Sequence, residues 1–343
     1  MKTLLVDDTP IDIAPGTTVL QACWAAGAYV PALCAHPALP TTGHCGMCLV
    51  EVDGEVALSC DIAAAPGMAV TTTGERLETL RRKALSALLA NHPHECLTCP
   101  EREGCDRVSC SMGVDMAERC CERFGECEVQ QVAECVGIPS STPRFRPRGL
   151  PAFQRDTALH LYLDRCIACM RCVDACVSVK GHGALTWLEL VEGIFVGPSA
   201  GASFKEAGCK FCGACIEVCP AGSMLEQGPR GRRWRDLSRE KLAFPPMPLP
   251  PRRHLALAAD AVATVPAAPG AFRLFDAAGR VHLIEGVDNL REALGAHAAS
   301  GVATHFDFHE AQMYSQRANE LLQAHLKEHG KLPPGNDLDD DLF

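Results

Sequence analysis

Two runs of cysteines constrain this sequence more than any other feature. The runs "CIACMRCVDAC" and "CKFCGACIEVCP" both contain the spacing C-x2-C-x2-C-x3-C. The chain holds 21 Cys among 343 residues, and an odd number excludes a framework made only of paired disulfides. The N-terminal stretch has two acidic residues and no long apolar run, so no signal peptide is expected. In a reducing, cytoplasmic compartment such cysteines predict metal centres.

The spacing of the two runs resembles that of bacterial two-cluster ferredoxins. The resemblance implies that three Cys of each run bind one [4Fe–4S] cluster and that the fourth binds the other cluster. Pro220 follows the second run as in that pattern, whereas Val177 stands in its place after the first. Structural zinc is the alternative. The implied ligands are Cys166, Cys169, Cys172 and Cys219 for one cluster, and Cys176, Cys209, Cys212 and Cys215 for the other.

A third set of cysteines lies near the N-terminus, with the spacing C-x10-C-x2-C-x11-C: Cys34, Cys45, Cys48 and Cys60. Four thiolates around a compact CxxC suit two irons, and zinc is again the alternative. Gly43 and Gly46 let the backbone pass close to such a cluster. The stretch "VPALCAHPALPTTGHCGMCLVEV" resembles the [2Fe–2S] domain that begins the large iron–sulfur subunit of respiratory complex I. The same domain begins iron–sulfur subunits of NAD-linked hydrogenases and formate dehydrogenases, and the resemblance implies a β-grasp fold.

Local patterns indicate the elements around this set. Residues 2–6 and 11–13 alternate as strands do, and "DDTP" between them predicts a turn. A helix follows in "TTVLQACWAAGA", with Thr17 or Thr18 as its N-cap. Cys23 lies on this apolar helix and fits no ligand spacing. We expect it to pack as a small buried hydrophobic residue.

The segment after the first domain carries a histidine together with cysteines. The helix expected in "ERLETLRRKALSALLA" places Leu77, Leu80, Ala84 and Leu88 on one face. His94 fits no motif and is predicted to be exposed. The spacing H-x3-C-x2-C-x5-C then matches the His-plus-three-Cys [4Fe–4S] motif that follows the [2Fe–2S] domain in the same family. The residues of that motif are His92, Cys96, Cys99 and Cys105.

The last ligand of this motif has two candidates, because C-x5-C occurs twice. Cys105 closes the first copy and Cys127 the second. The stretch "FGECEVQQVAECVGI" resembles the family's sequence after its last ligand, which favours Cys127 and makes 100–126 an insertion. The insertion then supplies thiols for a further [4Fe–4S] cluster, with unligated thiols or zinc as the alternatives. Its cysteines are Cys105, Cys110, Cys120 and Cys121. The expected content is one [2Fe–2S] cluster and three or four [4Fe–4S] clusters.

The C-terminal part contains no cysteine. Residues 228–269 are rich in Pro, Arg and Ala, which predicts a linker. Residues 270–338 predict two strands joined by a turn at Ala278-Gly279, a helix from about Asp288, and a second helix closed by Gly330.

This order is similar to the GIY-YIG nuclease domain, and "LPPGN" resembles its closing Asn segment. Phe272 and Leu283 stand where the motifs have Tyr, and Ala293 where the helix has Arg. Without these residues no phosphodiester chemistry is expected.

The predicted fold class is α+β, with several small domains in series. The expected domains are a [2Fe–2S] β-grasp domain at 1–73, a helical His/Cys [4Fe–4S] domain at 74–150, a two-cluster ferredoxin-like domain at 151–227, a linker at 228–269, and a small α/β GIY-YIG-like domain at 270–338.

The order of the first three domains resembles the small iron–sulfur subunit of the diaphorase in NAD-reducing hydrogenases. It also resembles the front part of iron-only hydrogenases and of NAD-dependent formate dehydrogenases. No G-x-G-x-x-G follows a strand, so FMN and NAD(P) are expected only on partner subunits. The implied function is a non-catalytic electron-transfer subunit between a flavin subunit that oxidises NAD(P)H and a hydrogenase, formate dehydrogenase or low-potential acyl-CoA reductase.

Two other functions compete with this one. The first is the same relay inside an electron-bifurcating complex. The second is an iron–sulfur-regulated nucleic-acid protein that uses the C-terminal module. A net charge of −10 disfavours nucleic acid as a partner. No apolar stretch of the length needed to span a membrane is present.

Overall fold

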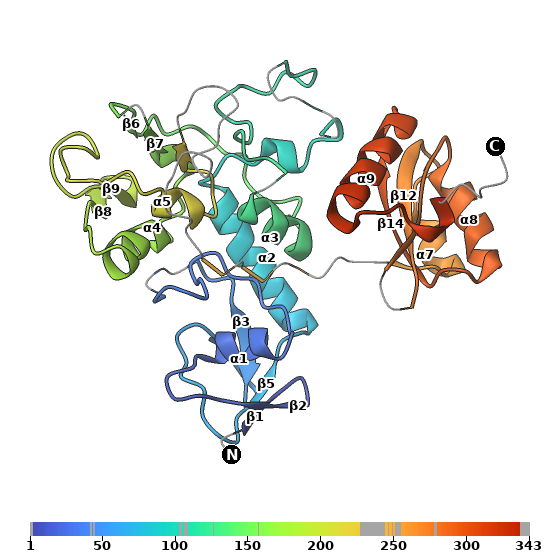
Figure 1. Ribbon diagram of the computed structural model, residues 1–343, viewed down its shortest axis with the longest axis horizontal. Helices are drawn as coiled ribbons and strands as arrows, with labels where there is room; N and C mark the ends of the chain where they lie inside the picture. Colours follow the sequence, from blue (N-terminus) through green and yellow to red (C-terminus); the bar gives the residue numbers. More distant parts are fainter. Residues whose placement is uncertain are drawn as a thin grey trace. The chain divides into compact units, whose positions relative to one another are not determined.

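The structure, a computed structural model, divides into two compact units, Met1–Pro251 and Arg252–Phe343. Figure 1 draws the first in blue to yellow and the second in orange to red. The structure describes residues 3–41, 43, 45–102, 105, 109–125, 127–156, 158–226, 244–245, 247–248, 250, 255–277 and 280–336.

A five-stranded sheet with one helix begins the first unit. Its strand order is β2-β1-β5-β3-β4, and β1 and β5 are parallel. Thr18 caps the helix in a capping box with Gln21, which confirms one of the two predicted N-caps. Cys23 is fully buried in the core, and its burial raises its pKa to about 12, as expected of a packing residue. The elements are β1 (Thr3–Val6), β2 (Thr9–Asp12), α1 (Val19–Ala25), β3 (Leu49–Val52), β4 (Glu55–Leu58) and β5 (Ala69–Thr71).

Helices α2 (Glu75–Leu89) and α3 (Glu128–Val136) follow, with the short helix η1 (Glu95–Leu97) between them. The buried face of α2 runs through Leu77, Leu85 and Leu89 and is rotated from the predicted one. Arg81 shares this face because its Nη2 donates to the carbonyl of Thr72 at 2.9 Å.

The two cysteine runs lie in a region of short strands and helices. Each run leads into a short helix, α4 followed by the π-helix η3 in the first case and α5 in the second. β10, β7 and β6 form one sheet in that order, and β8 and β9 form a hairpin. The elements are β6 (Ala152–Phe153), β7 (Leu159–Tyr162), η2 (Leu163–Arg165), α4 (Arg171–Asp174), η3 (Ala175–Val179), β8 (Leu185–Leu190), β9 (Gly193–Pro198), α5 (Ala214–Glu217) and β10 (Met224–Glu226).

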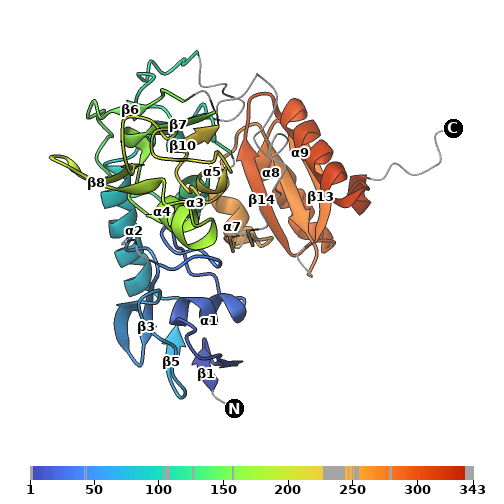
Figure 2. The ribbon, with the colours of Figure 1, turned by 60° about the vertical axis from the view of Figure 1, so that its left-hand side comes forward.

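The second unit is an antiparallel sheet with helices, and Figure 2 shows its strands together with α8 and α9. The strand order is β11-β14-β12-β13. The structure differs here from the predicted linker at 228–269, because Val262 and Val265 belong to the core of this unit. The elements are β11 (Leu255–Ala256), α7 (Ala259–Thr264), β12 (Gly270–Phe275), β13 (Val281–Val287), α8 (Leu290–Ser300), β14 (His305–Glu310), α9 (Tyr314–His329) and η4 (Pro334–Asn336).

The predicted strand pair and both predicted helices are present, with an additional strand, β14, between the helices. The predicted turn at Ala278-Gly279 lies outside the described residues. Asn336 accepts a hydrogen bond from the amide of Ile284 and donates one to its carbonyl, both at 2.7 Å. These bonds fasten the closing segment to β13. The likeness to a GIY-YIG domain stays a prediction.

Candidate metal centres

The four N-terminal cysteines converge on one another. Cys34, Cys48 and Cys60 are buried, and Cys45 is partly buried. Hydrogen bonds from Cys45 and Cys60 lower the pKa of Cys34, and one from Cys60 lowers the pKa of Cys48. The same contacts raise the pKa values of Cys45 and Cys60. The four sulfurs therefore lie close enough to share hydrogen bonds, an arrangement in which bound iron would replace the shared protons.

Gly43 lies between this set and the first ferredoxin run. A Cβ added to Gly43 would lie 2.6 Å from Cβ of Cys34 and 2.7 Å from the carbonyl oxygen of Cys169. Such contacts are too short for a side chain, so only glycine lets the two loops approach this closely. One backbone segment therefore separates Cys34 of the N-terminal set from Cys169 of the first ferredoxin run.

Each ferredoxin run contributes cysteines to two separate cavities. One cavity is lined by Cys166, Cys169, Cys172 and Cys219. The other is lined by Cys176, Cys209, Cys212 and Cys215. The fourth cysteine of each run has thus crossed to the cavity of the other run, the grouping that the ferredoxin resemblance implies.

The two cysteine loops have equivalent backbone conformations. Ala168 and Phe211 occupy the same place in their runs, and both have φ of 52°. Met170 and Gly213 follow, with φ of 61° and 80°. Through these turns the amide of Ala168 donates to Sγ of Cys166 at 3.4 Å, and the amide of Phe211 to Sγ of Cys209 at 3.3 Å. Amides aimed at sulfur are the donors that iron–sulfur ligands require.

Arg171, within the first run, is fully buried. Its Nη1 donates to the carboxylate of Glu128 on α3 at 2.8 Å, and its Nη2 to the carbonyl of Ala35 at 2.7 Å. Its Nε is buried without a hydrogen-bond partner among the described residues. Burial raises the pKa of Cys169, and the positive charge of Arg171 opposes that rise. The same charge adds to the hydrogen bonds from Cys45 and Cys60 that lower the pKa of Cys34. Arg171 therefore joins three segments of the first unit, and its positive charge acts on cysteines of two different sets.

His92 faces a third cavity, whose lining also includes Cys120, Cys121 and Cys127. Its Nδ1 lies 3.1 Å from the carbonyl oxygen of Arg165, which requires Nδ1–H and leaves the lone pair on Nε2. Burial lowers the pKa of His92 to about 4, so the ring is neutral near pH 7. A neutral imidazole oriented by a carbonyl is suited to bind a metal.

The prediction that His94 is exposed is wrong. Its side chain is 4% exposed, and its Nδ1 lies 2.9 Å from the carbonyl of His92. No spacing in the sequence predicts this contact between the His94 ring and the His92 carbonyl, because it depends on the conformation of the loop.

The His92 cavity lies directly against the end of the second ferredoxin run. Sγ of Cys127 donates to the carbonyl of Pro220 at 3.3 Å, and Nη1 of Arg123 to the carbonyl of Cys219 at 3.1 Å. A Cβ at Gly222 would lie 2.6 Å from Sγ of Cys121. The segment that carries Cys219 therefore forms a wall between the two sites.

The other cysteines of this region lie differently. Cys96 lies beside Cys120, whose amide donates to the Cys96 sulfur at 3.3 Å. Cys99, Cys105 and Cys110 are partly buried. In the part of the chain that the structure describes, no group of three His, Cys, Asp or Glu side chains is placed to hold a single metal ion.

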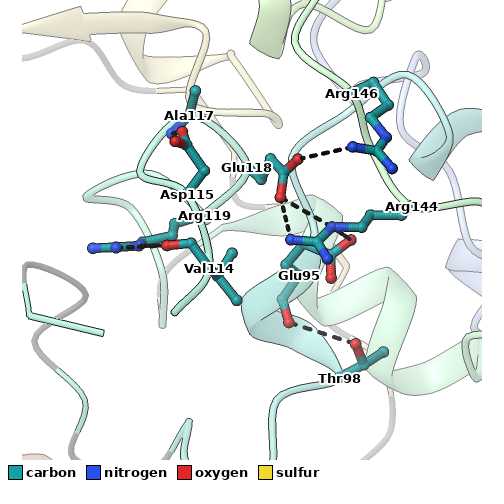
Figure 3. A network of polar contacts seen from close by, with 9 residues as sticks. All are labelled: Glu95, Thr98, Val114, Asp115, Ala117, Glu118, Arg119, Arg144 and Arg146. Atoms are coloured by element: carbon teal, nitrogen blue, oxygen red, sulfur yellow. Dashed lines mark hydrogen bonds and ion pairs between the residues drawn. The ribbon is translucent and has the colours of Figure 1, made fainter. Parts of the chain in front are cut away.

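A polar network holds the chain just before Cys96 and just before Cys120 (Figure 3). The buried carboxylate of Glu118 accepts from Nε of Arg144 at 3.0 Å. Nε of Arg144 also lies 3.7 Å from the carboxylate of Glu95. One guanidinium thus fixes both backbone segments that present these two neighbouring cysteines.

Family models match two parts of the chain. Residues 1–75 match the 2Fe-2S iron-sulfur cluster binding domain, and residues 165–223 match the 4Fe-4S dicluster domain. None of the helices in the described ranges has the length and apolar character needed to cross a membrane.

Curated relatives match about two thirds of the chain. An NADH-quinone oxidoreductase subunit of Rhizobium meliloti (strain 1021) is 33% identical over 66% of this chain. The NADP-reducing hydrogenase subunit HndD of Solidesulfovibrio fructosivorans is 28% identical, also over 66%. The chain spans only 24% and 36% of the lengths of these two relatives.

A solved structure, that of an NAD+-reducing [NiFe]-hydrogenase in the H2-reduced state, aligns with a TM-score of 0.52 at 27% identity. The alignment covers 69% of this chain and 94% of that chain. The matches confirm the resemblance predicted from the cysteine spacings: over about two thirds of its length, the chain is similar to subunits of NAD(P)H-linked oxidoreductases, and it contains a 2Fe-2S cluster binding domain and a 4Fe-4S dicluster domain.

Proposed function

We propose that the chain is an electron-transfer subunit that connects an NAD(P)H-oxidising flavin subunit to a separate catalytic oxidoreductase subunit. The observation that carries the proposal is the contact between its cysteine sites. Gly43 separates Cys34 from Cys169 by a single backbone segment, and the segment after Cys219 lies against Cys121 and Cys127. Bound iron–sulfur clusters supply one-electron acceptors, and the protein sets their separation and surroundings.

Each candidate set has a role in this proposal. The N-terminal set holds a [2Fe–2S] cluster, the two ferredoxin cavities hold one [4Fe–4S] cluster each, and the region of His92 holds a His-ligated [4Fe–4S] cluster. FMN and NAD(P) belong to the partner subunits. The number of cysteines favours a reducing, cytoplasmic location. The names of the relatives, which include NAD(P)-linked hydrogenase and quinone oxidoreductase subunits, support this assignment of partners.

The direct test is exchange of electrons within the chain. Anaerobically purified protein would receive a sub-stoichiometric pulse of reduced methyl viologen and be freeze-quenched at increasing times. The [2Fe–2S] and [4Fe–4S] signals, which EPR separates by temperature, should reach their equilibrium ratio together. If the ratio of the [2Fe–2S] signal to the [4Fe–4S] signal did not change with time, the clusters would not exchange electrons and the relay would be contradicted.

Substituting Gly43 by Ala tests the contact between the first two sites. The added Cβ collides with Cys34 and with the backbone of Cys169, so the loops must move apart. We expect a destabilisation of about 1–3 kcal/mol, as for other overpacked positions, and slower exchange between the [2Fe–2S] and [4Fe–4S] signals. Gly295→Ala is the matched control, because a Cβ there meets nothing within 4 Å. Wild-type exchange in Gly43→Ala protein would show that this contact is not part of the relay.

The C-terminal unit is expected to serve in docking and not in cluster binding. No cysteine follows Cys219 in the sequence. Truncation after Pro251 retains Phe244, whose ring packs edge-on against His36 at 5.7 Å. The truncated protein should keep its full iron content and bind its partner subunits less tightly in pull-down from the native complex. Metal-dependent DNA cleavage that disappears with the truncation would instead identify a nuclease.

A further inference from the structure

We propose that the His-ligated cluster is held by His92, Cys120, Cys121 and Cys127, and that the cysteines of the predicted motif form a second site with a cluster of its own. The second site comprises Cys96, Cys99, Cys105 and Cys110. This inference rests on the proposed iron–sulfur function and goes beyond it, because it changes which residues bind which cluster.

The first argument is the equivalence of three cavities. Each ferredoxin cavity is lined by the four cysteines that the ferredoxin pattern assigns to one cluster. The His92 cavity is similarly lined by one imidazole and three thiols. A [4Fe–4S] cluster requires four protein ligands, one for each iron. The lining of the His92 cavity supplies that number without Cys96, Cys99 or Cys105.

The second argument is the orientation and support of these ligands. The Arg165 carbonyl holds the His92 ring with Nε2 available for a metal. Cys127 precedes α3, and the amide of Val129 donates to the Pro220 carbonyl at 3.2 Å. The cavity also has apolar walls, including Leu97 and Phe124. A dry, shaped site with oriented ligands is what a buried cluster needs.

The third argument concerns Cys96 and Cys120. The amide of Cys120 donates to the Cys96 sulfur at 3.3 Å, whereas the thiol of Cys120 donates to the carbonyl of Pro93 at 3.7 Å. Each ligand of a [4Fe–4S] cluster binds a different iron at a separate corner. Only Cys120 of this pair lines the His92 cavity, so Cys96 is assigned to the other site.

The second site follows from the cysteines that remain. Their spacing is C-x2-C-x5-C-x4-C, which places four thiols in a stretch of 15 residues from Cys96 to Cys110. Glu118 and Arg144 hold Cys96 and Cys120 side by side, so the two sites adjoin at this pair. The chain would then contain one [2Fe–2S] cluster and four [4Fe–4S] clusters, about eighteen irons in all.

The test uses the full-length protein, purified anaerobically from cells grown with either 14N- or 15N-histidine. Pulsed EPR of the reduced protein detects the cluster that carries a histidine nitrogen, and iron analysis counts the clusters. Two variants alter the His92 cavity, Cys121→Ser and Cys127→Ser. Two matched variants, Cys99→Ser and Cys105→Ser, alter the second site. The [2Fe–2S] signal reports in every sample that the protein has folded.

Wild-type protein should contain about eighteen irons, and each variant should lose about four. The histidine coupling should disappear in the Cys121 and Cys127 variants and persist in the Cys99 and Cys105 variants. Loss of the coupling in the Cys99 or Cys105 variants, with retention in the Cys121 variant, would overturn the assignment. About fourteen irons in the wild type would show that the second site holds no cluster and would overturn that part. A wild-type protein with all its clusters but no electron exchange would instead refute the proposed function alone.

Discussion

Replacing Cys172 by Ser is expected to interrupt electron exchange between the [2Fe–2S] centre and the rest of the chain. Cys172 lines the cavity that it shares with Cys169 and Cys219. Cys169 lies across Gly43 from the N-terminal set, and Cys219 lies beside the His92 cavity. Loss of this cluster therefore removes the centre that lies between the N-terminal set and the His92 cavity. We expect the variant to lose about four irons and to show no exchange in the freeze-quench experiment.

The [2Fe–2S] signal of the Cys172→Ser protein should remain, because that set has its own four ligands in a separate sheet-based core. Cys23→Ala is the matched control, since Cys23 is a buried cysteine outside every cavity described above. It should retain all iron and wild-type exchange. Exchange at the wild-type rate in Cys172→Ser protein would exclude the ferredoxin sites from the relay.

Replacing Arg171 by Met is expected to weaken the first unit and to lower two reduction potentials. The guanidinium is fully buried and is bound to Glu128 and to the Ala35 carbonyl, and its removal leaves both without their partner. Removing one member of a buried pair costs about 3 kcal/mol. Because the positive charge stabilises negative charge at Cys34 and Cys169, its loss should shift the potentials of both associated clusters to more negative values. Anaerobic denaturation and EPR-monitored redox titration measure the two effects.

Arg82→Met is the matched control for this charge. Arg82 also binds a glutamate, Glu78 at 3.0 Å, and a carbonyl, but its side chain is 40% exposed. An exposed pair of this kind contributes about 1 kcal/mol or less. Its removal should leave both potentials unchanged. Equal potential shifts in the two variants would mean that burial of Arg171 between the sites has no electrostatic role.

Much of the ferredoxin region was predictable because cysteine spacing is a local property. The two runs repeat one backbone turn, and each turn places its first three cysteines without help from distant residues. The N-cap at Thr18 and the burial of Cys23 were also predictable, because each depends on residues close by in the sequence. Matches to family models confirmed both cluster-binding domains.

Contacts between distant segments were not predictable in this way. The approach of Gly43 to Cys169 and the three-way bonding of Arg171 join residues far apart in sequence, and no spacing encodes them. The buried face of α2 was rotated because Arg81 satisfies its charge with backbone carbonyls inside the core. The cysteines between 96 and 127 share one repeated spacing, so the sequence left their grouping open. In the structure Cys120, Cys121 and Cys127 line the His92 cavity, and Cys96 is not among its lining residues.

Cys176 and Cys219 each line the cavity of the other ferredoxin run, and this affects how the two sites take up metal. Each ferredoxin cavity takes thiols from both runs, so the chain from Cys176 to Cys209 is closed into a loop at two points. Bound metal at either point restricts the unfolded chain as a covalent crosslink would, and the restriction vanishes when the metal leaves. On the proposed assignment, insertion of the first cluster would therefore organise the ligands of the second. Oxidative loss of one would loosen the other, and damage to this region should proceed as a single cooperative event.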